Sequence, residues 1–345
     1  MIRRLAAVIV AGALMAAPAH SGDLTYRVLG FGDLEGWDGD DHAAALRVFL
    51  NTCPDIDPPD WQSLCAVAQN IDNPKAFFEL FFRPVQIENG EQPLFTGYFE
   101  PELDGSTVRS DRFRYPVYRM PGEARQTARW MSRREIETSG VMEGRGLEIA
   151  WVDDPVELFF LQVQGSGRIR LPNGHHIRIG YAGSNGHEYR SVGVELIRRG
   201  IYARHQVSAQ VIKSWVRRNP DEGLELLRHN PSYVFFREID LVSPESGPLG
   251  AMNRSVTAGR SIAVDPEFTP LGAPVWIEKG GETPLHRLMM AQDTGSAIKG
   301  PQRADIFFGT GDAAGRAAGK LRDGGRMLVL LPIQRAYALL PEAEQ

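Results

Sequence analysis

Three aspartates in the C-terminal part of the chain lie beside short apolar segments that are typical of strands. Asp265 lies in Ala-Val-Asp-Pro, Asp293 lies in Ala-Gln-Asp-Thr-Gly, and Asp305 directly precedes Ile-Phe-Phe. Loops at the ends of strands on a rigid scaffold often carry catalytic groups, so the three carboxylates could converge on one face. The alternative is that they only form turns, since Asp is common before Pro and before Thr-Gly.

Asp305 is the strongest candidate for acid–base chemistry. Apolar surroundings disfavour the charged form of a carboxyl group and raise its pKa. A carboxylic acid that stays protonated near neutral pH can donate its proton to a leaving oxygen. The apolar residues after Asp305 are therefore expected to keep it protonated. Lys299 precedes it on a glycine-flanked turn. This lysine either points inward, to orient a sugar hydroxyl or tune Asp293, or is simply exposed.

A different chemistry is suggested by Ser296 and Lys299, which match the S-x-x-K pair of Ser-Lys acyl enzymes. A helix would have to align the two side chains, but glycines flank the segment and the sequence has no K-T-G partner motif. The sequence also lacks an H-E-x-x-H zinc motif and a phosphate-cradling loop. It therefore predicts no metal and no nucleotide cofactor.

Two further segments, 96–100 and 162–166, place polar side chains beside aromatic rings at the ends of predicted strands. Aromatic rings offer apolar contact area to a sugar, while neighbouring polar groups fix its orientation. The alternative is that both segments are strand ends packed between domains. The substrate-binding candidates are Thr96, Tyr98, Glu100, Gln164, Gly165 and Ser166.

The elements that would position these residues are short helices and strands. Capping residues and apolar periodicity predict helices at 41–50, 73–82, 126–138, 188–199, 208–218 and 312–321. Strands are predicted at 94–100, 157–164, 168–171, 176–181, 260–264, 273–278, 286–291, 304–308 and 326–331. Short strands at this spacing favour a small barrel in the C-terminal third. Residues 243–250 read as a linker.

The N-terminus predicts export to the periplasm. Residues 1–19 combine a cationic start, an apolar run and an Ala-Pro-Ala cleavage site, which is the pattern of a signal peptide. No cysteine follows the run, so no lipid anchor is expected. Cys53 and Cys65 are expected to pair in an oxidising compartment, the alternative being two free buried thiols. The net charge of −5 argues against a nucleic-acid partner.

Five motifs, in order from about residue 90 to the C-terminus, resemble the membrane-bound lytic murein transglycosylase A family. They are Phe95-Thr-Gly-Tyr-Phe-Glu-Pro101, Phe160-Leu-Gln-Val-Gln-Gly-Ser-Gly167, Asn185-Gly-His-Glu-Tyr-Arg-Ser191, Val264-Asp-Pro-Glu-Phe-Thr-Pro-Leu-Gly272, and Ala291-Gln-Asp-Thr-Gly-Ser-Ala-Ile-Lys-Gly300 followed by Asp305-Ile-Phe-Phe-Gly. The resemblance implies a mainly β, α+β fold. Residues 20–104 and 246–345 would form a double-psi β-barrel, with a three-aspartate unit at about 250–335. Residues 105–245 would form an inserted β-rich substrate-binding domain, and a glycan strand would lie in the groove between the two domains.

The same resemblance implies the reaction and the site. The family cleaves the β-1,4 bond between N-acetylmuramic acid and N-acetylglucosamine in peptidoglycan, leaves a 1,6-anhydromuramic end and needs no metal. By position, Asp305 is the catalytic acid/base, and Asp265, Asp293 and Lys299 bind substrate, with Asp293 the fallback acid. The expected partners are peptidoglycan glycan strands, with cell-wall synthesis or division proteins as further candidates, and the expected state is a monomer. The alternative is a non-catalytic peptidoglycan-binding scaffold.

Overall fold

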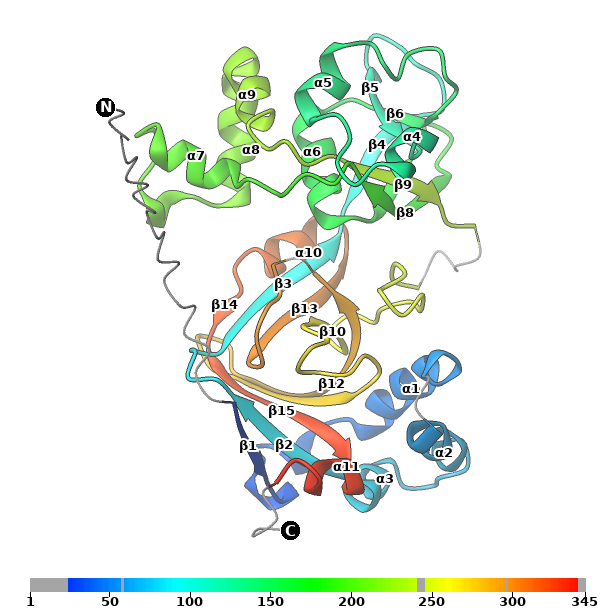
Figure 1. Cartoon of the computed structure of the whole chain (residues 1–345), viewed down its shortest axis with the longest axis vertical. Coiled ribbons are helices and arrows are strands. Elements are labelled where there is room, and N and C mark those ends of the chain that lie inside the picture. The colour runs from blue at the N-terminus through cyan, green and yellow to red at the C-terminus, as the bar shows by residue number, and fades with distance from the viewer. Residues whose placement is uncertain (1–23, 57–58, 241–245, 296, 341–345) are drawn as a thin grey trace, which may run out of the picture.

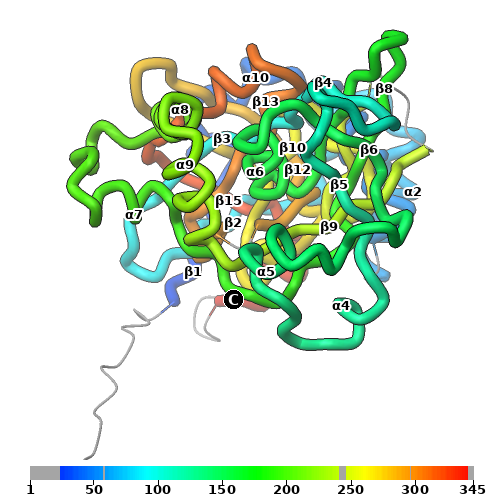
Figure 2. Tube along the Cα trace, turned by 90° about the horizontal axis from the view of Figure 1, so that it is seen from above, coloured from blue at the N-terminus to red at the C-terminus, as the bar shows by residue number. Residues whose placement is uncertain are grey.

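The computed structural model describes residues 24–56, 59–240, 246–295 and 297–340. They form two units, one around a nine-stranded sheet and one around a six-stranded sheet. The six-stranded unit lies above the other in Figure 1, and the view from above shows its helices over the strands of the first unit (Figure 2). The expected signal peptide at 1–19 lies outside the described residues, as does part of the expected linker.

The nine-stranded sheet combines strands from both ends of the chain. Its strands are β1 (Thr25–Val28), β2 (Phe82–Glu88), β3 (Leu94–Glu100), β10 (Ser261–Val264), β11 (Pro274–Lys279), β12 (Leu285–Thr294), β13 (Arg303–Thr310), β14 (Arg322–Asp323) and β15 (Gly325–Pro332). Their order is β1-β2-β15-β11-β12-β10-β13-β3-β14. Neighbours are antiparallel, except that β10 pairs with β12 and β13 pairs with β3 in parallel.

Apolar side chains of this sheet and of the N-terminal helices share one core. β11 is buried along its whole length and β15 from Met327 onward, so these strands are covered on both faces. Trp276 of β11 and Phe49 of the first helix are both fully buried in this core. The helices of this unit are α1 (His42–Thr52), α2 (Pro59–Ala68), α3 (Pro74–Phe81), α10 (Gly311–Ala318) and α11 (Ile333–Tyr337), with short 3-10 turns η1 (Phe31–Asp33), η2 (Trp37–Gly39) and η3 (Cys53–Asp55).

Two helix starts are set by side-chain caps, as the sequence predicts. The Asp41 side chain accepts a hydrogen bond from Ala44 N at the start of α1, and the Asn73 side chain accepts one from Ala76 N at the start of α3. Such caps satisfy backbone N–H groups that have no partner within the helix. A disulfide joins Cys53, at the end of α1, to Cys65 of α2, with their Cα atoms 5.7 Å apart.

The six-stranded sheet is built from the middle of the chain. Its strands are β4 (Glu102–Ser106), β5 (Tyr115–Tyr118), β6 (Glu148–Val152), β7 (Gly167–Arg170), β8 (His176–Ser184) and β9 (Val234–Glu238), in the order β5-β6-β4-β7-β8-β9. Its helices are α4 (Gly122–Gln126), α5 (Arg133–Thr138), α6 (Pro155–Gln164), α7 (Val192–Arg198), α8 (Ala209–Arg218) and α9 (Pro220–Leu227), with the turn η4 (Arg204–Gln206). The mainly β, α+β fold class is confirmed. In the nine-stranded sheet, β1 and β14 are the edge strands. No strand pairing among the described residues joins these two edges, which is the pairing that would close the predicted barrel.

The prediction of a strand at 157–164 is wrong, because this segment is helix α6. The Asp154 side chain accepts hydrogen bonds from Val156 N and Glu157 N, and Pro155 occupies the first helical position. Gly165 ends the helix in the left-handed conformation, at φ 79°. The run of Phe, Leu and Val favours a strand by propensity. Here the side-chain cap and the packing of α6 against α8 and α9 stabilise a helix instead.

The helix predicted at 126–138 is also wrong in extent. The chain forms two short helices there, α4 and α5, and the Ser132 side chain begins the second by accepting from Glu135 N. The helix predicted at 188–199 begins later, at Val192, because Ser191 caps it by accepting from Val194 N. Both errors come from reading continuous helical periodicity across a capping serine.

The two units meet at a buried carboxylate. Glu100, the last residue of β3, has 0% of its side chain exposed. Its oxygens lie 2.8 Å from Arg168 Nε and 3.1 Å from Arg178 Nε, both from the six-stranded sheet. The Thr310 hydroxyl of β13 donates to Glu100 Oε2 at 2.7 Å, so the same carboxylate is held from both units.

Candidate active site

Asp305 lies on β13 beside β3, and the pairing of these strands sets its surroundings. The parallel register places Asp305 opposite Thr96 and Phe307 opposite Tyr98. The Thr96 hydroxyl donates to Asp305 Oδ1 at 2.6 Å. Within the described residues, the other carboxyl oxygen, Oδ2, has no hydrogen bond. Asp305 thus presents one anchored oxygen and one open oxygen.

Burial raises the pKa of Asp305, while the Thr96 hydrogen bond and the charge of Arg303 lower it by smaller amounts. Because side chains alternate along a strand, Ile306 points into the core of the nine-stranded unit, whereas Phe307 shares the face of Asp305. Phe307 is 1% exposed, and its ring lies 5.1 Å from the Tyr98 ring. The apolar neighbour on the face of Asp305 is therefore Phe307, backed by Tyr98.

Asp293, near the end of β12, lies within electrostatic reach of Asp305. Burial raises the pKa of Asp293, and the negative charge of Asp305 adds to that rise. Its Oδ1 accepts hydrogen bonds from Ala251 N and Thr294 N, each at 2.9 Å, and these favour the ionised form. The backbone thus fixes the orientation of Asp293.

The charges of both carboxylates act on the hydroxyl group of Tyr98. Burial raises the pKa of Tyr98 well above its ordinary value, and the charges of Asp293 and then Asp305 raise it further. The buried hydroxyl makes no hydrogen bond of ordinary geometry among the described residues, but it interacts with the Asp293 carboxyl and lowers the pKa of that group. A buried hydroxyl without a partner is costly, so Asp293 is the group that this hydroxyl serves in the unliganded protein.

Asp265 shares no hydrogen-bond partner with Asp293 or Asp305 among the described residues. It is 3% exposed, and its Oδ2 accepts from Gly300 N at 3.0 Å. Lys299 Nζ lies 3.4 Å from Asp265 Oδ1, although most of the lysine side chain, 68%, is exposed. Asp265 therefore holds the turn at 299–300, and Lys299 is paired with Asp265 rather than with Asp293. Ser296, the other half of the Ser-Lys candidate, lies outside the described residues.

The remaining predicted binding residues lie at the junction of the two units. Gln164 is the last residue of α6, Gly165 ends that helix, and Ser166 precedes β7. Glu100 is buried; its Oε2 accepts from Arg168 and Thr310 and its Oε1 faces Arg178 at 3.1 Å, so any effect on binding would be indirect. No hydrogen bond between described residues joins these four residues to Asp305.

Arg303 is a site residue that the sequence reasoning missed. Its Nη2 donates to Thr96 Oγ1 at 2.8 Å, next to the Asp305 carboxyl. Arg303 lies just outside the strand predicted at 304–308, and β13 begins one residue earlier, at Arg303. The available signal was its position two residues before Asp305, which places both side chains on one face of an extended strand.

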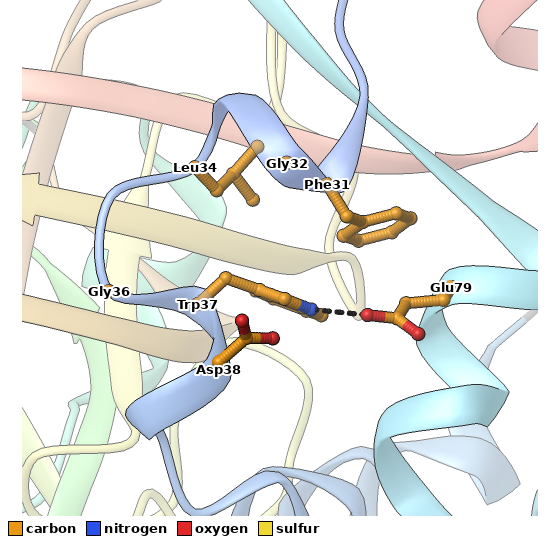
Figure 3. A pocket seen from close by; sticks show the side chains of 7 residues that line it. All are labelled: Phe31, Gly32, Leu34, Gly36, Trp37, Asp38 and Glu79. Atoms are coloured by element: carbon orange, nitrogen blue, oxygen red, sulfur yellow. Dashed lines mark hydrogen bonds between the residues drawn. The ribbon is translucent and has the colours of Figure 1, made fainter.

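A separate cavity of about 190 Å³ lies in the N-terminal segment (Figure 3). Its lining includes Phe31, Trp37, Asp38 and Glu79, and Trp37 Nε1 donates to Glu79 Oε1 at 2.9 Å. None of the predicted site residues lines it. In the part of the chain that the structure describes, no group of three His, Cys, Asp or Glu side chains could hold a metal ion. No helix among the described residues is long and apolar enough to cross a bilayer.

Comparison with known proteins places this chain in a family. The model of the MltA specific insert domain matches residues 94–237, and the model of the 3D domain matches residues 260–331. A Vibrio cholerae protein named membrane-bound lytic murein transglycosylase A is 32% identical over 290 residues, which cover 79% of this chain and 76% of the relative.

Solved structures agree with this assignment. MltA from Neisseria gonorrhoeae is 35% identical, with a TM-score of 0.80 over 92% of this chain and 96% of that one. Escherichia coli MltA with bound chitohexaose is 29% identical, with a TM-score of 0.74 over 89% of this chain and 94% of that one. The chain therefore belongs to the lytic murein transglycosylase A family, a class of peptidoglycan-cleaving lyases.

Proposed function

We propose that this protein is a lytic transglycosylase that cleaves the β-1,4 bond between N-acetylmuramic acid and N-acetylglucosamine, with Asp305 as its single acid/base. The observation that carries this proposal is a part-buried carboxyl whose pKa burial raises and whose Oδ2 is open. Family membership supports the reaction class, and the E. coli relative solved with chitohexaose supports an oligosaccharide ligand.

The chemistry needs one carboxyl group in two protonation states. In the first step, protonated Asp305 gives its proton to the glycosidic oxygen as the bond from muramic C1 to that oxygen breaks. In the second step, the Asp305 carboxylate removes the proton of the muramic C6 hydroxyl as O6 bonds to C1. The products are a 1,6-anhydromuramic end and a free N-acetylglucosamine 4-hydroxyl. No water is consumed, so the second carboxylate of an ordinary glycosidase is not needed.

The neighbouring groups suit substrate binding. Asp293, oriented by two backbone N–H groups, can accept a hydrogen bond from a sugar hydroxyl or amide. The Tyr98 hydroxyl, which interacts with Asp293, can help to orient that carboxylate. Gln164, Gly165 and Ser166 belong to the six-stranded unit, and we propose that they contact the glycan further from the cleaved bond. We propose that the protein acts in the periplasm after export.

The decisive variant is Asp305→Asn, because asparagine keeps the size of the side chain but cannot donate and reclaim a proton. We expect parent enzyme to release anhydromuropeptides from purified peptidoglycan sacculi, measured by mass spectrometry. Asp305→Asn should lower the rate by at least about 10²-fold, the lower end of general acid–base contributions. The variant should still sediment with sacculi.

Asp293→Asn is the matched control for that variant. It removes a carboxylate of similar burial but should mainly raise KM and leave the anhydro product unchanged. Reducing-end products from the parent would show a hydrolase instead and overturn the proposal. Binding without turnover by the parent would support the alternative of a peptidoglycan-binding scaffold.

A further inference from the structure

Arg303, Thr96 and Asp305 form a directed chain of hydrogen bonds. Arg303 Nη2 donates to Thr96 Oγ1 at 2.8 Å, and Thr96 Oγ1 donates to Asp305 Oδ1 at 2.6 Å. The guanidinium is held from its other side, because Nη1 donates to the carbonyl oxygens of Ala304 at 2.6 Å and Leu94 at 3.3 Å. Backbone of both β3 and β13 thus fixes the start of the chain.

The direction of this chain follows from the chemistry of its members. A guanidinium only donates hydrogen bonds, so Thr96 must use a lone pair to accept from Arg303. A hydroxyl has one proton, and among the described residues Asp305 Oδ1 is the only acceptor for the proton of Thr96, so that proton points to Oδ1. Oδ1 must then act as an acceptor. When Asp305 is protonated, its proton therefore resides on Oδ2, the oxygen without a partner among the described residues.

Thr96 also separates the two charges. No nitrogen–oxygen contact of 4.0 Å or less joins Arg303 to Asp305, although the structure describes both side chains. A direct bidentate ion pair would strongly favour the ionised carboxylate and remove the acid from the site. With a neutral hydroxyl between them, Arg303 orients the carboxyl group without pairing with it.

We infer that Arg303 is a positioning residue which acts through Thr96, forcing the threonine hydroxyl onto Asp305 Oδ1 and so assigning the transferred proton to Oδ2. This inference rests on the proposed function, because it presumes that Asp305 is the acid. The proposal gives Arg303 no contact with the substrate or with the reacting atoms. Its positioning effect exists only while Thr96 carries a hydroxyl, whereas the effect of its charge on the Asp305 pKa does not depend on that hydroxyl.

A double-mutant cycle tests this dependence. Arg303→Met and Thr96→Val should each lower kcat for anhydromuropeptide release by about 10- to 100-fold with little change in KM, because both misplace the acid. In the Thr96→Val background, Arg303→Met should change kcat by less than about twofold, the usual scatter of additivity. Thr96→Ser should keep most of the activity, because it keeps the hydroxyl.

The pH profile supplies a second readout that a purely structural role would not move. The charge of Arg303 lowers the pKa of Asp305. The basic limb of kcat/KM, where the acid form is lost, should therefore lie at higher pH in Arg303→Met than in the parent. Arg303→Lys keeps the charge and should leave that limb in place. Arg322, an exposed arginine opposite Thr96 on β14, gives the matched control Arg322→Met, expected to behave as parent.

The outcomes separate this inference from the function it rests on. If Asp305→Asn keeps full anhydro activity, the acid assignment fails, whatever Arg303 does. If Asp305→Asn is inactive but the double variant of Arg303 and Thr96 loses kcat by the product of the two single losses, only the positioning role is overturned. Circular dichroism and thermal melting check folding. If Arg303→Met does not fold, the same cycle is run with Arg303→Gln, which removes the charge, and a multiplicative result there overturns the inference as well.

Discussion

At the residue scale, the site keeps a carboxyl group where its charged form is unfavourable. Burial raises the pKa of both Asp305 and Asp293, yet their hydrogen bonds differ. Asp293 accepts two backbone N–H groups, whereas Asp305 accepts a single hydroxyl. This difference makes Asp305 the better acid and Asp293 the better fixed acceptor.

The raised pKa of Asp305 has a consequence for stability. Its folded-state pKa lies above the unfolded value of about 3.9, so the stability linked to the protonated form is complete below that value. This stability is lost as pH rises through the folded-state pKa. Asp305→Asn removes the charge, so its melting temperature should exceed that of the parent, and the difference should grow from about pH 4 to about pH 8.

The exposed Asp312 of α10 provides a matched control for this stability effect. Asp312→Asn makes the same chemical change without removing a buried charge. A melting-temperature difference between Asp305→Asn and parent that stays flat across the pH range would contradict the raised pKa.

At the scale of elements, the junction of the two units depends on Glu100. Thr96 and Glu100 lie on the same strand, β3, so the strand that anchors the acid also carries the buried carboxylate. Arg168 and Arg178 reach Glu100 from β7 and β8. A change at this carboxylate therefore acts on both units.

Glu100→Gln should destabilise the protein by about 3 kcal/mol, because it leaves buried arginines without their counter-charge. Urea unfolding measures this loss. Arg170→Gln is the control, because its pair with Asp104 is largely exposed, at 52% and 36%, and should contribute less than about 1 kcal/mol. Equal losses in the two variants would refute the junction role of Glu100.

Local chemistry decided which elements could be predicted from sequence. The starts of α1 and α3 were predictable, since Asp41 and Asn73 are strong caps with a direct backbone contact. The α6 helix was not predictable, because its apolar residues suit a strand equally well. Only its packing against α8 and α9 favours the helix. In the site, the three aspartates were selected by motif and resemblance. Arg303 was missed because its role depends on its hydrogen bond to Thr96. Thr96 is distant in sequence and comes near only through the pairing of β3 with β13.

At the scale of the whole molecule, the nine-stranded unit is held together by contacts between distant parts of the chain. The disulfide between Cys53 and Cys65 ties α1 to α2, whose Trp61 and Cys65 belong to the same core as β11 and β15. Strands from both chain ends pair within one sheet, β2 with β15 and β3 with β13, so stability of the N-terminal helices supports the sheet that carries Asp305.

Replacing both cysteines by serine should lower stability by about 3 kcal/mol, the chain-entropy value for a loop of this size. Denaturant unfolding of the double variant under oxidising conditions measures it. Added reductant should lower the parent's midpoint and leave the double variant unchanged. A parent insensitive to reductant would show that the bridge contributes little.

The parallel pairing of β3 with β13 joins Thr96 to Asp305 across 209 residues of sequence. An incompletely synthesised copy, or one that has lost its C-terminal strands, holds Thr96 without Asp305. If Asp305 is the acid, as we propose, the protein gains its proton donor only after both strands have been made and paired, and a fragment without β13 would lack lytic activity.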